Sequence, residues 1–365
     1  MSDFSEISEQ EITMPYDDIE KDEKDETPDQ ADYKLSSYGI DFDVSGLVRR
    51  LNNDSIYLPD FQRNYVWSIK KGSKFIESLL LGLPVPGIFL YKEDEAQKML
   101  IIDGFQRLET IKLFYQGIFG KKKFELSDVV EEFDGKSYFD LSDELKRKID
   151  DTLLHATIIK ADNPKEKNFN AIYMIFERLN TGGVNLSPQE IRNCVSHGKL
   201  QKKIEELSKD DDIKLVIKLD PKRKKDQEIV LRFIALSDNY NEYNGNMKQY
   251  LNNYMFANRD MSNSRINKII ENTKTIFKII KDMKLDEVIR PNGSLNLAIL
   301  DSLWVGIYHR HNQNNTIDKV DLKRTIDGLL ESEEYKEAIS TGKTHHKDSV
   351  INRINITVEE LSKSK

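Results

Sequence analysis

The segment Asp103-Gly104-Phe105-Gln106-Arg107 combines residue types that could bind a phosphate group. Gly104 permits a tight turn and a close approach of the backbone to a ligand. A helix starting here would point N–H groups and the positive end of its dipole at an anion, and Arg107 could grip phosphate oxygens with its forked guanidinium. Asp103 could hold Mg²⁺ or a ribose hydroxyl. The alternative is a structural turn in which Asp103 caps the helix and Arg107 pairs with a neighbouring acid.

A second cluster of polar and aromatic residues runs from Pro59 to Trp67. Its aromatic rings could stack on a base while Arg63 reaches a phosphate. The structural alternative is a loop that Phe61 and Trp67 pin to the core, with Arg63 held in an ion pair.

A third cluster spans Arg178 to Gly183. Its two glycines allow positive φ, and successive N–H groups there could form an anion-binding nest. A helix end capped by glycine accounts for the glycines equally well. It does not explain why Arg178, Asn180 and Thr181 gather at this place.

The first of these clusters follows a regular succession of elements. Ser68 can cap a helix whose apolar residues recur at helical spacing, namely Ile76, Leu79, Leu80 and Leu83. Apolar runs at 88–91 and 99–102, separated by a polar turn, predict a β-hairpin. The helix after Asp103-Gly104 is expected to bury Leu108, Ile111, Tyr115 and Ile118. The expected order is helix, strand, strand, turn, helix.

The length of 365 residues, the charge distribution and the secondary-structure pattern predict an acidic tail followed by two domains. Residues 1–32 carry thirteen acids and two lysines, a net charge of −11, so the total of −8 leaves +3 on the rest. We expect residues 1–33 to be a disordered tail, either a solubilising extension or a polyanion that competes for a DNA-binding face. Short β-like runs and helices mix over 38–160, including runs at 56–59 and 155–160. Nearly everything after residue 165 has a helical pattern, so we expect an α+β domain over 34–195 and a helical domain over 196–365.

The helical half has two clear patterns. Ser187-Pro188-Gln189-Glu190 is typical of a helix N-terminus, with Ser as the cap and Glu three residues later. Buried stripes are expected at Phe169, Ile172, Tyr173 and Phe176, and at Ile266, Ile269, Ile270, Phe277 and Ile280.

Other features exclude whole classes of protein. The single cysteine, Cys194, excludes a disulfide scaffold and a zinc site with paired thiolates. The six histidines lack metal-ligand spacing, and Gly342-Lys343-Thr344 lacks the first glycine of a P-loop because residue 337 is Glu. No long apolar window or export signal is visible, so we expect a cytoplasmic protein that does not enter a membrane. The basic runs 121–123 and 222–225 are either solvated faces or contacts to a DNA backbone.

Taken together, the motifs resemble the N-terminal domain of the GmrSD-type modification-dependent restriction endonucleases, relatives of the ParB/sulfiredoxin nucleotide-binding fold. The similarity rests on four ordered motifs at 61–67, 82–86, 102–108 and 176–183, the last followed by Leu186 and Glu190. Weaker similarity continues at 226–232, 250–255 and 344–353, so that it spans roughly 38–355. The resemblance implies a ParB-like α+β fold, binding and often hydrolysis of a nucleoside triphosphate with Mg²⁺, and a role in phage defence.

Carried over to this chain, the resemblance implies three catalytic candidates and a wider binding set. The catalytic candidates are Asp103, which would also hold Mg²⁺, Gln106 and Arg107. The nucleotide-binding candidates are Gln62, Arg63, Gly104, Arg107, Arg178, Asn180, Thr181 and Gly183. Phe105 stands where the family has the first Gln of a Gln-Gln pair, which would slow hydrolysis if that amide is catalytic.

The function favoured by these patterns is a nucleotide-dependent sensor or regulator in a restriction system. Because no His is followed by Pro three residues later, as in the nuclease domain of large family members, cutting is expected to need a partner nuclease or toxin chain. The expected partners are a nucleotide, DNA, that second chain and a further copy of the protein. Two alternatives stay open: a stand-alone metal-dependent endonuclease using Asp103 with Glu77 or Glu109, and a non-enzymatic antitoxin-like protein.

Overall fold

The computed structural model describes residues 35–58, 65–93, 98–161, 166–179, 186–219, 221–291, 293–313, 317–340 and 345–363. Contacts along the chain divide these residues into two compact units, with the break between Leu186 and Ser187. We call them the N-terminal unit and the helical unit. None of the described helices is long and apolar enough to cross a membrane.

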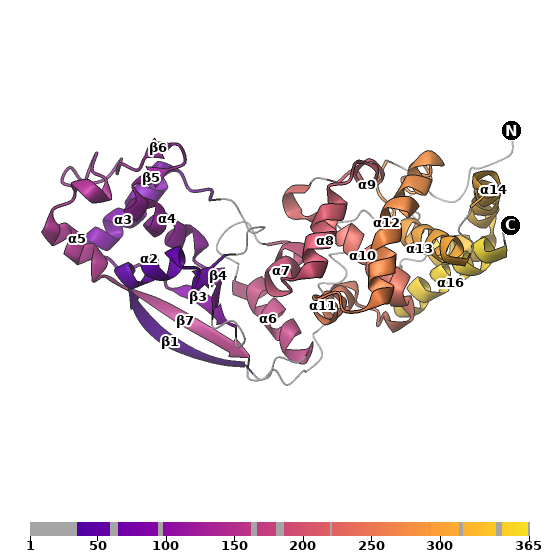
Figure 1. Cartoon of the computed structure of the whole chain (residues 1–365), viewed down its shortest axis with the longest axis horizontal. Coiled ribbons are helices and arrows are strands. Elements are labelled where there is room, and N and C mark those ends of the chain that lie inside the picture. The colour runs from indigo at the N-terminus through magenta and orange to yellow at the C-terminus, as the bar shows by residue number, and fades with distance from the viewer. Residues whose placement is uncertain are drawn as a thin grey trace. The chain divides into compact units, whose positions relative to one another are not determined.

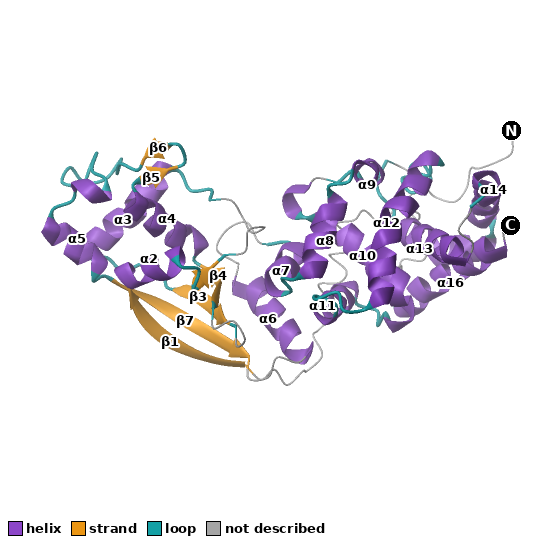
Figure 2. Cartoon of the chain, viewed as in Figure 1, coloured by secondary structure: helices purple, strands orange, loops and turns teal. Residues whose placement is uncertain are grey.

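The N-terminal unit holds a five-stranded mixed sheet (Figures 1 and 2). Its strands are β1 (Leu35–Asp43), β2 (Ile56–Tyr57), β3 (Ile88–Lys92), β4 (Met99–Asp103) and β7 (Leu153–Ala161), in the order β1-β7-β3-β4-β2. β1 pairs antiparallel with β7 and β3 with β4, while β3 is parallel to β7 and β2 to β4. A second, two-stranded sheet joins β5 (Ile118–Phe119) and β6 (Lys122–Lys123).

Helices cover the core face of the large sheet. They are α2 (Val44–Asn52), α3 (Ile69–Leu81), α4 (Phe105–Gln116) and α5 (Asp143–Asp150), with a 3₁₀ turn at Tyr138–Asp140. Leu47 of α2, Ile76 of α3 and Leu108 of α4 pack into one apolar core with the inward residues of β3, β4 and β7. The last helix of this unit, α6 (Glu166–Leu179), contacts β4. The core therefore holds the start of α4 rigidly at the end of β4.

The helical unit is built from helices around its own core (Figure 2). Its α-helices are α7 (Pro188–Val195), α8 (Lys199–Ser208), α9 (Asp211–Ile217), α10 (Lys225–Asn239), α11 (Met247–Ala257), α12 (Ser264–Asp282), α13 (Leu297–Gln313), α14 (Lys319–Glu331), α15 (Glu333–Ser340) and α16 (Lys347–Lys363). Two 3₁₀ turns lie at Pro221–Arg223 and Tyr240–Glu242. α10 contacts α8, α11, α12 and α13, and α13 contacts α16, so α10 and α13 form the centre of this unit.

Most of the local predictions are confirmed. The hairpin, the cap of α3 by Ser68 and the capping box of Ser187 with Glu190 all form. The chain is mixed α+β with a mostly helical C-terminal part, as the textures predict. The stripes at 172–176 and 266–280 are buried wherever the structure describes them, whereas the side chain of Phe169 lies outside the described part.

Two residues assigned to buried helix stripes were placed wrongly. Leu83 and Ile118 lie beyond the helices that were to contain them and are about half exposed. In both cases the helix stops one or two residues earlier at a glycine in the left-handed conformation, Gly82 after α3 and Gly117 after α4. The helical spacing of apolar residues thus continues beyond the glycine, although the helix itself ends there.

Candidate functional site

The turn between β4 and α4 requires a glycine. Gly104 has φ of 101°, in the left-handed region that other residues rarely adopt. A Cβ at this position would lie 2.4 Å from Cγ2 of Ile88 on the neighbouring strand β3. The backbone therefore enters α4 in a tight turn that leaves the first helical N–H groups directly after the strand end.

Arg107 bridges three parts of this junction. Its Nη2 donates to Oδ2 of Asp103 at 2.7 Å and to the carbonyl oxygen of Gly87 at 3.0 Å. The side chain is 16% exposed, and its Nε is buried with no hydrogen-bond partner among the described residues. Arg107 therefore forms the ion pair with a neighbouring acid that a purely structural turn would have. In addition, one of its guanidinium N–H groups has no acceptor among the described residues.

Gln106 positions the loop that precedes α3. Its Oε1 accepts hydrogen bonds from the backbone N–H groups of Val66 and Trp67, at 3.1 and 3.3 Å. The described end of the second sequence cluster, at Val66 and Trp67, is therefore adjacent to the first. The amide oxygen is used for this contact, which gives Gln106 a positioning role at the turn.

A second chain of hydrogen bonds ties the same loop to α4. Oγ1 of Thr110 donates to the carbonyl oxygen of Gln106 at 2.6 Å, and it lies 2.8 Å from the hydroxyl of Tyr65. Since the single proton of Thr110 is used, Tyr65 is the donor. Burial raises the pKa of Tyr65, which keeps that proton in place. Sequence reasoning missed both residues, because the contact joins positions 45 residues apart.

Phe105 is partly buried and packs against the apolar core of the N-terminal unit. This position contributes to packing in the present chain.

The remaining predicted residues are divided between described and undescribed parts of the chain. Arg178 is exposed near the end of α6, the helix that contacts β4 in the same unit. Five others lie outside the described residues, namely Gln62, Arg63, Asn180, Thr181 and Gly183. Their assignment to the binding set stays a prediction.

The carboxylates proposed as alternative metal ligands have other contacts. Glu77 is buried and accepts from the backbone N–H of Val130 at 2.6 Å and from Lys74 at 3.1 Å. Glu109 lies 4.0 Å from the ammonium of Lys112. Within the described ranges, no three His, Cys, Asp or Glu residues lie close enough together to hold a metal ion. The stand-alone endonuclease therefore has no ligand cluster in this part of the chain.

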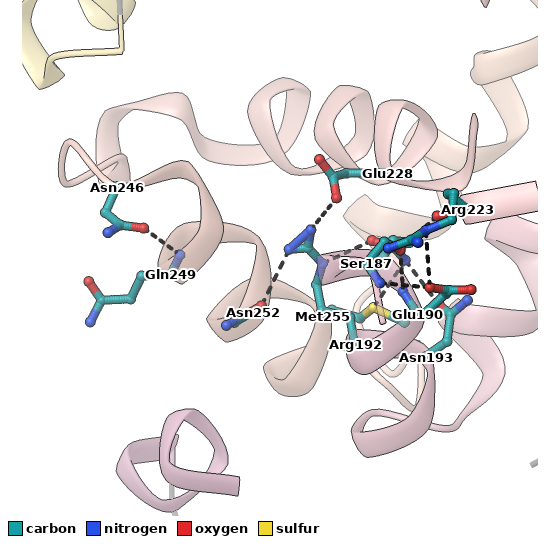
Figure 3. Close-up of polar contacts among 11 residues, drawn as sticks. Ser187, Glu190, Arg192, Asn193, Arg223, Glu228, Asn246, Gln249, Asn252 and Met255 are labelled. Carbon is teal, nitrogen blue, oxygen red and sulfur yellow. Dashed lines mark hydrogen bonds and ion pairs between the residues drawn. The ribbon is translucent and has the colours of Figure 1, made fainter. Parts of the chain in front are cut away.

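Motif residues of the helical unit meet in a buried polar network (Figure 3). Arg192 on α7 donates to Oε2 of Glu228 at 2.6 Å, to Oε1 of Gln189 at 2.9 Å and to Oδ1 of Asn252 at 3.4 Å. Asn193 donates to Gln227 at 2.7 Å. The network joins α7, α10 and α11, so the motif residues Glu228 and Asn252 help to hold these helices together.

Residues 44–196 match the family model described as "GmrSD restriction endonuclease, N-terminal domain". This segment is similar to the GmrSD N-terminal domain. No curated protein and no solved structure matches the chain. The GmrSD match begins just after β1, contains the Gly104 turn, and extends through α7 into the helical unit.

Proposed function

We propose that this protein is a nucleotide-binding regulator of a restriction system and acts with a separate nuclease or toxin chain. The GmrSD N-terminal domain supports the restriction-system role. The observation that carries nucleotide binding is the Gly104 turn, where Arg107 is only partly satisfied beside an accessible carboxylate.

Binding of a triphosphate would exchange the partners of Arg107. A phosphate oxygen is a strong acceptor for a guanidinium and could replace Asp103, whose side chain is 36% exposed. The first N–H groups of α4 and the positive end of its dipole would face the same phosphate. The displaced carboxylate of Asp103 would then be free to hold Mg²⁺, which neutralises charge on the phosphates.

We propose a regulatory role because we find no nuclease features among the described residues or in the sequence motifs. The described residues contain no cluster of metal-ligating side chains, and the histidine spacing of the family's nuclease domain does not occur in the sequence. We therefore assign cleavage to a second chain and DNA recognition to the complex. Nucleotide binding by this protein would report to that partner.

Loss of the Arg107 guanidinium is the direct test of nucleotide binding. Arg107→Ala is expected to weaken binding of ATP or GTP with Mg²⁺ by about ten- to a hundred-fold, since a charge-assisted hydrogen bond contributes roughly 1.5–3 kcal/mol. Isothermal titration calorimetry measures this change, with circular dichroism as a check of folding. The matched control is Lys112→Ala on the same helix, whose ammonium lies beside Glu109 and away from the turn; it should bind as the parent does.

A conservative variant separates charge from geometry. Arg107→Lys keeps the positive charge but cannot contact Asp103 and the Gly87 carbonyl with a planar fork. It should bind more tightly than Arg107→Ala and more weakly than the parent. Equal nucleotide affinity in parent and Arg107→Ala would contradict the assignment of the turn.

Hydrolysis is tested at Phe105. Phe105→Gln restores the amide of the family motif and is expected to raise the steady-state rate of phosphate release more than the affinity, because a catalytic amide acts on the transition state. Phosphate release and nucleotide titration are measured on the same preparations. A drop in thermal stability without a faster rate would show that Phe105 serves the core alone.

A further inference from the structure

Strand β1 forms one edge of the five-stranded sheet. It ends the order of the five-stranded sheet, and β7 is its only strand partner among the described residues. Six of its nine residues in succession, Ser36 to Asp41, are exposed. No proline, lysine or arginine occurs in Leu35–Asp43, although these residues commonly block pairing at sheet edges.

The apolar core face of the sheet continues onto β1, where the described helices no longer pack over it. In the register with β7, Tyr38 lies opposite Ile158 and Ile40 opposite Ala156. Residues paired in this way share one face, and both partners on β7 are fully buried in the core. Tyr38 and Ile40 are nevertheless 43% and 36% exposed, because the described helices cover this face only as far as Phe42.

The two carboxylates of β1 are already engaged within the chain. Oδ1 of Asp41 lies within hydrogen-bonding distance of Nδ1 of His155, at 2.7 Å, and Asp43 caps α2 by accepting from the N–H of Gly46. Neither acid therefore stands as an unpaired charge that would repel an incoming strand at the edge.

We propose that β1 pairs antiparallel with β1 of a second copy of this chain, across a twofold axis at Gly39. Gly39 is the middle residue of the nine, so this register pairs the whole strand. It places Tyr38 of each copy opposite Ile40 of the other, and such aromatic and β-branched pairs stabilise adjacent strands. The core faces of the two sheets join into one, and four apolar side chains cover one another at the junction.

The charges favour this arrangement. Asp41 lies opposite Ser37 and Asp43 opposite Leu35, whereas an axis at Asp41 would bring two Asp41 carboxylates face to face. The two Leu35 residues lie at opposite ends of the joined strands, about 27 Å apart at ~3.4 Å per residue. The two strand starts, each preceded in the sequence by the acidic residues 1–32, are thus separated by more than the ~8 Å screening length.

The assembly is measured on the full chain by sedimentation velocity between about 1 and 100 µM, because one strand pair forms a small interface of moderate affinity. We expect a dimer in this range. Ile40→Lys should weaken dimerisation at least about tenfold, since it adds a charge at the junction. The control is Leu153→Lys, which replaces a 62%-exposed apolar residue of β7 on the opposite face and should leave the dimer unchanged.

Disulfide trapping tests the register. Paired residues of antiparallel strands have Cα atoms roughly 4.5–5.5 Å apart, which a disulfide can span. Oxidation of a mixture of Ser37→Cys and Asp41→Cys chains should give a covalent dimer, and neither preparation alone should do so. The native Cys194 is buried and does not compete. A chain that stays monomeric, a dimer weakened equally by both lysine variants, or trapping by Ser37→Cys alone would overturn the proposal.

Discussion

Asp301→Asn is expected to lower the stability of the helical unit by about 3–5 kcal/mol. Asp301 on α13 is fully buried and accepts from Nε and Nη2 of Arg232 on α10, at 2.7 and 2.6 Å. The guanidinium of Arg353 on α16 lies 3.5 Å from the same carboxylate and is also buried. Two buried guanidinium groups thus share this carboxylate, and its loss removes a charged partner from each of them.

The expected ranking of stability losses among three variants makes this prediction specific. Arg353→Met should cost less than Asp301→Asn, because it keeps the ion pair of Arg232 with Asp301, whereas Asp301→Asn removes a charged partner from both arginines. The control Asp327→Asn removes an exposed carboxylate paired with Lys323 and should shift the transition little.

Trp304 reports on this unit alone when Trp67 is replaced by Phe. Trp304 lies in the core of the helical unit, and the other tryptophan, Trp67, packs on Phe75 in the N-terminal unit. Urea unfolding followed by Trp304 fluorescence in this background avoids a two-state fit to two units. An unchanged midpoint for Asp301→Asn would show that the arginines are compensated in another way.

Arg192→Leu is the second change with a large expected effect, again about 3–5 kcal/mol. It leaves Glu228 buried without the guanidinium that donates to it at 2.6 Å, and it removes the donors to Gln189 and Asn252 (Figure 3). The capping box of α7 would remain, so the loss would report on packing of α7 against α10 and α11.

A double variant tests the cause. Arg192→Leu with Glu228→Leu should recover part of the lost stability, because removing both members of a buried pair avoids the uncompensated carboxylate. Lys203→Leu, which breaks an exposed pair with Glu206, is the matched control and should leave the unfolding midpoint close to that of the parent. A double variant less stable than Arg192→Leu would show that the charge of Glu228 is compensated by other groups.

Local sequence patterns predicted the elements around the turn because their interactions span only a few residues. Ser68 caps α3 through the N–H of Lys71, and Ser187 pairs with Glu190 in its capping box. The glycine of the Asp103-Gly104 turn was likewise recognisable as a position needing conformational freedom. The same reasoning missed β1. Tyr38, Ile40 and Phe42 alternate there with Ser37, Gly39 and Asp41, but the strand forms by pairing with β7, more than a hundred residues away.

The sequence by itself determined the α+β and helical textures, the strand-turn-helix order and the residues gathered at the phosphate-binding candidate. Only the tertiary structure decided what those residues contact. Arg107 reaches the Gly87 carbonyl and Gln106 reaches Val66 and Trp67 across 20 to 40 residues of chain, and Asp301 meets arginines on two other helices. Spacing predicts contacts within one helix or hairpin, whereas the partners of these side chains depend on how separate elements pack around a shared core.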